Sequence, residues 1–185
     1  IELAKELFKR KNKIFGSCWG LQVLVTAAGG KVRKNPQGLE AILAKDIELN
    51  DLGSSHPMYK NKKQKFNAFC WHYDEAEILP SNTKVLASNK KSEFQSISFE
   101  LDKSSIWAVQ YHPEFNPSWM SGLMSQRKDI LLKNNIYKTS LDFEKEKNIF
   151  ENFNKLSAQE LSSYNDVIDE TKHSLEISNW LGLSI

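Results

Sequence analysis

The sequence is poor in cysteine, carries no dominant charge and contains no long apolar run. Two cysteines among 185 residues, Cys18 and Cys70, are too few and too far apart for a disulfide framework or a zinc site. The net charge of +2 gives no reason to expect a nucleic acid or a membrane surface as partner. No apolar stretch is long enough to span a membrane, and none has the pattern of a signal peptide. We therefore expect a reducing, cytoplasmic setting and no metal site.

The rest of the composition is that of an ordinary globular domain. Hydrophobic residues make up 40% and charged residues 26% of the chain, whose length suits one domain with room for an appendage. The one basic run, residues 60–65, is interpreted as a solvated loop rather than a phosphate site. No glycine-rich phosphate loop is present, so we expect no nucleotide cofactor.

The segment from Gly16 to Gln22 has the pattern of a sharp turn that presents a nucleophile. A short apolar run at 13–15 precedes it, and a helix-like run at 23–28 follows and ends in the glycines at 29–30. Cys18 stands between two glycines at the centre of the turn, where neighbouring side chains would collide with the strand and the helix. The N–H groups of the helix N-terminus favour a thiolate at this position. The alternative is that Cys18 is a small buried apolar residue.

Two further strand-like runs lead into clusters of polar and aromatic residues. The run 66–71 leads into residues 72–75, and the run 106–110 leads into residues 111–115. The carboxyl ends of strands are where α/β proteins build their sites.

His112 and Glu114 form a base with a carboxylate that can orient it. They are two residues apart in an extended segment, so both side chains leave the same face. Pro113 fixes the backbone between them. The carboxylate can accept a hydrogen bond from one ring nitrogen and hold the other nitrogen toward a thiol. Taken alone, this segment also fits a structural His-Pro turn.

The remaining pattern predicts an α/β domain with a helical end. Residues 1–135 are expected to form the main domain, and residues 136–185 a helical extension that packs on the outside of the sheet or binds a partner. Ser157 and Glu160 have capping-box spacing. Further strands are expected at 31–33, 40–49 (a helix is not excluded there), 85–87 and 94–99, and helices at 1–8, 119–132, 143–153, 157–167 and 174–181.

Together, Gly16-Ser17-Cys18-Trp19-Gly20-Leu21-Gln22 and Gln110-Tyr111-His112-Pro113-Glu114 resemble the motifs of the class I glutamine amidotransferases. The segment 71–75 is similar to the histidine-aspartate segment of the GMP synthetase glutaminase domain, and stand-alone proteins of that kind are the most similar subgroup. The resemblance covers residues 14–114. It implies a flavodoxin-like, doubly wound α/β sheet.

The resemblance also assigns roles to residues. It implies that Cys18 is the nucleophile, His112 the base and Glu114 its orienter, with no cofactor. Gln22 would help to hold the substrate glutamine. The backbone of Tyr73 and Asp74 would line the same pocket, and the N–H of Trp19 would be an oxyanion donor. We expect His112 within hydrogen-bond reach of the Cys18 sulfur, and Cys70 buried and inert.

The chain departs from the family at its start. The first strands of the family, and the loop that gives a second oxyanion donor, have no counterpart before the turn at Cys18. We therefore expect an N-terminally truncated domain with an apolar sheet edge beside Ile14 and Phe15, which by itself is inactive.

The implied reaction is hydrolysis of the glutamine side-chain amide through a cysteinyl-glutamyl thioester. The ammonia would pass to an acceptor on another domain or on a synthetase subunit. Two alternatives remain open: a γ-glutamyl peptide or conjugate hydrolase on the same scaffold, and a non-catalytic regulatory protein. The triad residues do not separate the first two, because both need the same chemistry.

Overall fold

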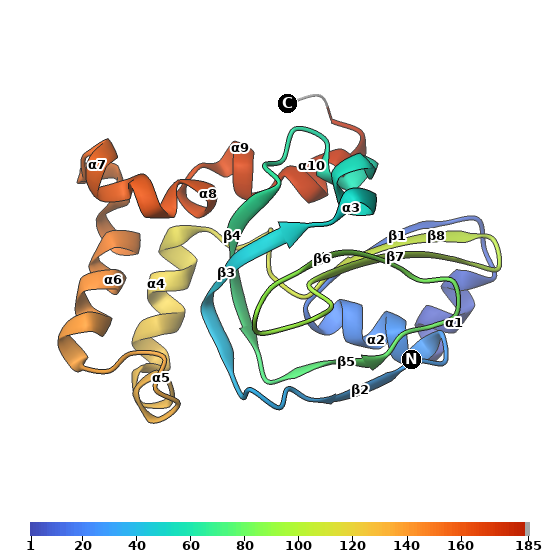
Figure 1. Ribbon diagram of the computed structural model, residues 1–185, viewed down its shortest axis with the longest axis horizontal. Helices are drawn as coiled ribbons and strands as arrows, with labels where there is room; N and C mark the ends of the chain where they lie inside the picture. The colour runs from blue at the N-terminus through green and yellow to red at the C-terminus, as the bar shows by residue number, and fades with distance from the viewer. Residues whose placement is uncertain (184–185) are drawn as a thin grey trace.

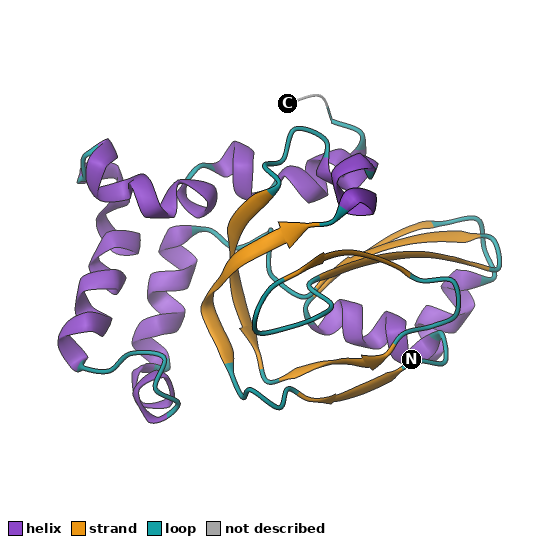
Figure 2. Ribbon diagram, viewed as in Figure 1, coloured by secondary structure: helices purple, strands orange, loops and turns teal. Residues whose placement is uncertain are grey.

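The computed structural model describes residues 1–183 and shows an α/β fold built on one curled sheet, with helices packed against it (Figures 1 and 2). The strands are β1 (Lys13–Ser17), β2 (Lys31–Lys34), β3 (Glu40–Leu49), β4 (Lys65–His72), β5 (Asp74–Ile78), β6 (Lys84–Ser88), β7 (Ser96–Leu101) and β8 (Ser104–Val109). The α-helices are α1 (Glu2–Phe8), α2 (Trp19–Ala27), α3 (Asp51–Ser55), α4 (Pro117–Gln126), α5 (Lys128–Lys133), α6 (Ser140–Asn152), α7 (Ala158–Leu161), α8 (Asn165–Ile168), α9 (Glu170–His173) and α10 (Leu175–Leu181). Three 3-10 turns are η1 (Pro57–Tyr59), η2 (Phe153–Lys155) and η3 (Ser162–Tyr164).

The main sheet has the strand order β1-β8-β7-β6-β3-β4. β1 and β8 run parallel, and the other neighbours in this sheet are antiparallel. Helices α1 and α2 lie beneath the β1–β8–β7 part in Figure 1. There Phe8, Leu21 and Val25 pack on Ile106 and Ala108. The expected α/β fold with helices at the C-terminal end is confirmed.

β1 lies at the edge of the sheet. Its residues pair with Ser105–Val109 of β8, and no second strand pairs with it among residues 1–183. An open cavity of about 680 Å³ runs along this edge and is lined by Leu7, Ile14, Phe15 and Val23, among others. The expected apolar edge beside Ile14 and Phe15 is therefore confirmed.

A second, two-stranded sheet joins β2 and β5. None of the strands expected from the sequence covers residues 74–78, whose acidic residues are poor strand formers. Tertiary contacts overcome that preference: the carboxylate of Glu75 accepts hydrogen bonds from Arg33, Asn35 and Ser92. β5 is thus a strand that the sequence analysis missed.

The C-terminal helices cover β3 and β4. Met124 of α4, Phe143 and Phe150 of α6 and Val167 of α8 share one core with Phe69 of β4. The helices on both sides of residue 135 contribute to this core, and the division of the chain at that point stays a prediction. The capping box at Ser157 is confirmed, but the single helix expected over 157–167 is wrong, because the chain there forms α7, η3 and α8.

Candidate active site

Cys18 lies at a sharp turn between β1 and α2. Its φ of 49° and ψ of −106° are a strained combination for a residue with a side chain. A Cβ added at Gly16 would lie 2.6 Å from Leu24 Cδ1 and 2.9 Å from the carbonyl carbon of Gly20, so glycine is required there. The clash expected at Gly20 is wrong: a Cβ on Gly20 would point into open space, with no described atom within 4 Å.

The thiol of Cys18 is buried and held by two neighbours. Its Sγ donates toward the Trp71 carbonyl at 3.5 Å and accepts from Gln110 Nε2 at 3.8 Å. Burial raises the pKa of Cys18 to about 11; the N–H of Trp19 and the amide of Gln110 oppose this rise, and the charge of Glu114 adds to it. The N–H of Trp19 at the helix N-terminus lowers the pKa of Cys18, as expected, but desolvation outweighs it and the net pKa is raised.

His112 is paired with the carboxylate expected to orient it. The distance from His112 Nδ1 to Glu114 Oε1 is 2.7 Å, and the Ser17 hydroxyl donates to the same oxygen at 2.9 Å. Burial alone would raise the pKa of Glu114, but the hydrogen bond and charge of His112 outweigh it, so the pKa is lowered. Within residues 1–183 no hydrogen bond joins His112 to Cys18, whose sulfur contacts Trp71 and Gln110 instead, so the expected contact with His112 is not formed.

The ring of His112 is stacked on an aromatic neighbour. The His112 and Phe115 rings have centroids 3.8 Å apart and planes inclined by 4°. Trp119 packs on Phe115 at 3.9 Å. The side-chain oxygen of Asn116 caps α4 by accepting from the backbone N–H of Trp119, and the indole of Trp119 lies next to Phe115. The stack and the Glu114 hydrogen bond together restrict the imidazole in both plane and rotation.

The four residues expected to bind substrate are only partly brought together. Trp19, Gln22 and Asp74 line the cavity along β1. Gln22 Nε2 donates to the Asp74 carbonyl at 2.9 Å, so α2 is tied to the start of β5. Tyr73 stands apart: its side chain is 41% exposed, and its carbonyl accepts the N–H of Asn35.

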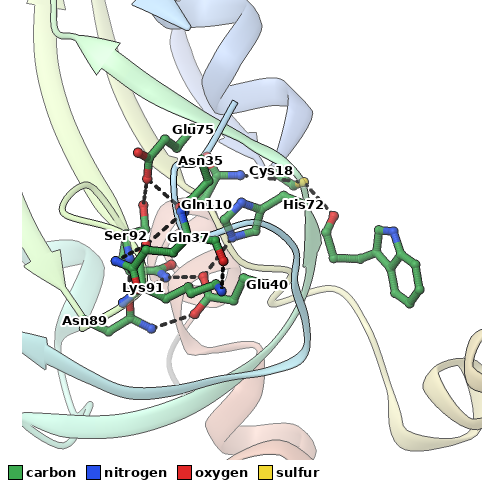
Figure 3. A network of polar contacts seen from close by, with 12 residues as sticks. Cys18, Asn35, Gln37, Glu40, His72, Glu75, Asn89, Lys91, Ser92 and Gln110 are labelled. Carbon is green, nitrogen blue, oxygen red and sulfur yellow. Dashed lines mark hydrogen bonds and ion pairs between the residues drawn. The ribbon is translucent and has the colours of Figure 1, made fainter. Parts of the chain in front are cut away.

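A buried polar network contacts the turn between β4 and β5 (Figure 3). His72 contacts the Glu40 carboxylate through Nε2 at 2.8 Å and the Asp74 carbonyl through Nδ1 at 3.0 Å. Glu40 also accepts from Asn89 and Gln95, each within 2.8 Å. Because Trp71 precedes His72, this network also fixes the carbonyl that receives the Cys18 thiol.

Three further residues of the site were given no role in the sequence analysis, although two of them, Ser17 and Gln110, stand within its motifs. Gln110 directly follows β8, and its amide contacts the Cys18 sulfur. Phe115 and Ser17 give no local signal, since their contacts depend on how α4 and β1 pack. Within the described chain, no cluster of three His, Cys, Asp or Glu residues could hold a metal ion, and no helix is long and apolar enough to cross a membrane.

Comparisons with known proteins identify relatives of two kinds. A γ-glutamyl-L-1-hydroxyisopropylamide hydrolase from a Pseudomonas species is 32% identical over 189 residues, which is 98% of this chain and 64% of the relative. The GMP synthase of Elusimicrobium minutum is 32% identical over 112 residues, which is 59% of this chain and 20% of the relative. The chain thus spans less than two thirds of the length of either curated protein.

A solved structure and a family profile agree with these matches. The crystal structure of a glutamine amidotransferase from Thermotoga maritima superposes with a TM-score of 0.62 at 21% identity, over 91% of this chain and 67% of that one, which shows a shared fold. The profile "Glutamine amidotransferase class-I" matches residues 1–128. Its match covers the turn at Cys18, the His112–Glu114 pair and the sheet that positions them. The chain belongs to the class-I glutamine amidotransferase family.

Proposed function

We propose that the protein containing this chain hydrolyses the γ-glutamyl amide of a small organic amine. The observation that carries the proposal is the extent of the matches. The match to the γ-glutamyl amide hydrolase covers 98% of the chain and so includes the C-terminal helices, whereas seven GMP synthase matches cover between 55% and 74% of it. Those helices contact the segment that carries His112, so they belong to the part of the chain that shapes the site.

In the proposed reaction, Cys18 attacks the γ-carbonyl carbon of the substrate. The Sγ–C bond forms as the thiol proton moves to His112, and the carbonyl oxygen takes up negative charge near the N–H of Trp19. His112 then gives its proton to the leaving amine as the C–N bond breaks, which leaves a γ-glutamyl thioester on Cys18. A water molecule, deprotonated by His112, attacks the thioester and releases glutamate and the thiol.

The environment of the Cys18 thiol fits a nucleophile that is activated as substrate binds. A pKa of about 11 keeps Cys18 protonated at neutral pH. The thiol donates to the Trp71 carbonyl and not to the base. A bound γ-glutamyl group would displace this contact and turn the sulfur toward His112. Glu114 then stabilises the imidazolium that forms on proton transfer.

The amino-acid end of the substrate is assigned to the Gln22–Asp74 side of the site. The Gln22 amide nitrogen already donates to the Asp74 carbonyl, which leaves its oxygen to accept from the α-ammonium group of a glutamyl substrate. Trp19, which is 75% exposed, provides an apolar wall on the same side.

A second function is supported by the GMP synthase match: a glutaminase that delivers ammonia to a synthetase domain or subunit. The two proposals share every chemical step above. They differ in the amine that leaves, which is ammonia in one and an alkylamine in the other, and in the need for an acceptor partner.

The test is a comparison of kcat/KM for γ-glutamyl isopropylamide and for glutamine, measured with the full-length protein without any partner. We expect the alkylamide to be the better substrate by about tenfold or more, since a fitted apolar leaving group adds about 1–3 kcal/mol of discrimination. The Cys18→Ser variant is the control and should release no amine above background. Preference for glutamine, or turnover only after a synthetase is added, would overturn the first proposal in favour of the second.

A further inference from the structure

The segment that follows β8 and carries His112 has neighbours on two sides. Gln110 contacts Cys18, and the Glu114 carboxylate that pairs with His112 accepts from Ser17 beside Cys18. The Tyr111 side chain packs instead in a core with Tyr59 and Phe66. Tyr111 is fully buried there, and its hydroxyl donates to Glu176 of α10 at 2.6 Å. A second hydrogen bond joins the hydroxyls of Tyr111 and Tyr59, whose oxygens are 2.8 Å apart.

Glu176 is itself held in place. Its side chain is fully buried, and its second carboxylate oxygen accepts from Lys62 Nζ at 3.0 Å. Lys62, whose side chain is 5% exposed, also donates to the carbonyl of Lys172 in α9 at 2.7 Å. The carboxylate that binds Tyr111 is therefore locked between a loop after η1 and the end of α9.

A second contact reaches the peptide between the base and its carboxylate. His173 of α9 is buried, and its Nδ1 lies 3.0 Å from the carbonyl oxygen of Pro113, to which it donates. The backbone N–H of His112 donates to the Phe69 carbonyl at 2.8 Å. Residues 111–113 are thus fixed in turn by α10, β4 and α9.

We propose that α9 and α10 form a brace that positions His112 for proton transfer, with Tyr111 and His173 as positioning residues. This inference rests on the proposed function in taking His112 as the catalytic base. The hydrogen bonds to Tyr111 and Pro113 hold the backbone on either side of His112, so the imidazole stays where it can meet both Cys18 and the leaving amine. A displacement of about 1 Å in such a group can cost about 10²-fold in rate.

The chain offers a matched control that separates positioning from stability alone. Tyr137 is another buried tyrosine, and its hydroxyl donates to Glu146 of α6. It packs in the helical core over β3 and β4 and makes no hydrogen bond to residues 110–114 within the described chain. Tyr111→Phe and Tyr137→Phe therefore remove the same group from a similar environment, one beside the triad segment and one remote from it.

The experiment measures kcat, KM and Tm of the full-length Tyr111→Phe and Tyr137→Phe proteins on one γ-glutamyl amide that the wild-type protein turns over. We expect similar small decreases in Tm. Only Tyr111→Phe should lower kcat, by about tenfold or more with KM within about twofold, because the base and not the substrate pocket is displaced. Equal kcat for the two variants would overturn the proposal.

A second pair of variants tests the contact to Pro113. His173→Leu removes the donor and should lower kcat as Tyr111→Phe does. His173→Asn places an amide N–H near the position of Nδ1 and should restore most of the activity. Equal activity of the two His173 variants would contradict the brace. Preference of the wild-type protein for glutamine would defeat only the proposed substrate, since the variants are compared on a common substrate.

Discussion

The buried ion pair between Lys62 and Glu176 gives the sharpest test of how the C-terminal helices are attached. The substitution Lys62→Met keeps an unbranched side chain, one atom shorter, and removes the charge. It leaves the fully buried Glu176 carboxylate with the Tyr111 hydroxyl as its remaining donor, and it leaves the Lys172 carbonyl without the Lys62 ammonium. Breaking a buried pair in this way costs about 3–5 kcal/mol, since an uncompensated charge stays inside the protein.

The expected effect on thermal stability follows from that free energy. For a domain of this size, Tm falls by roughly 2–4 °C per kcal/mol, so Lys62→Met should lower Tm by roughly 6–20 °C. The double variant Lys62→Met/Glu176→Gln buries no charge and keeps an acceptor for Tyr111. It should lose no more than about 2 kcal/mol relative to the wild-type protein.

The neighbouring Lys63 provides the control. It pairs with Asp166 at 3.0 Å, but its side chain is 60% exposed. Lys63→Met should therefore cost less than about 1 kcal/mol. The assay is urea unfolding followed by circular dichroism, with Tm from a thermal scan. Equal losses of stability in Lys62→Met and Lys63→Met, or a double variant less stable than Lys62→Met alone, would refute the role assigned to the Lys62–Glu176 pair.

Three further predictions concern the site. Iodoacetamide should modify Cys18 before the fully buried Cys70, and peptide mapping that finds equal labelling of the two would contradict this. The rate of Cys18 modification should rise roughly tenfold per pH unit up to about pH 11, because the thiolate fraction grows until the pH passes the raised pKa of Cys18. Gly16→Ala should destabilise the protein by about 1–3 kcal/mol in urea unfolding, since its Cβ meets atoms at 2.6 and 2.9 Å, and an unchanged midpoint would refute the described turn. Phe115→Leu should lower kcat and move the NMR shifts of the His112 ring protons, with a coupling between the two residues of about 0.5–1.5 kcal/mol in a double-mutant cycle; unchanged ring-proton shifts would exclude the stack.

The parts of the site that the sequence predicts are those encoded by neighbours in the chain. The strained turn at Cys18 follows from Gly16 and from the helix-forming run after it. His112 and Glu114 pair as expected, but the extended segment expected between them is wrong: the backbone N–H of Phe115 donates to the His112 carbonyl at 3.3 Å, so Pro113 and Glu114 lie in a turn. Both arrangements are local, although the sequence predicts the wrong backbone geometry for the second.

The parts that the sequence does not predict depend on contacts between distant segments. Ser17 reaches Glu114 because β1 lies beside β8. The raised pKa of Cys18 depends on how deeply β4 and β8 bury the turn, and no local pattern encodes that depth. β5 is not predicted because its acidic residues disfavour a strand on their own. In the structure Arg33 of β2 lies across from Glu75 and forms an ion pair with it.

The most direct test of catalysis through a Cys18 thioester is to find the acyl group on Cys18 during turnover. The full-length protein would be mixed with γ-glutamyl isopropylamide, quenched with acid within the first turnovers, digested and mapped by mass spectrometry. We predict a γ-glutamyl group on the peptide that contains Cys18 and none on the peptide that contains Cys70. Release of the amine with no adduct on Cys18, and with activity retained in Cys18→Ser, would contradict it.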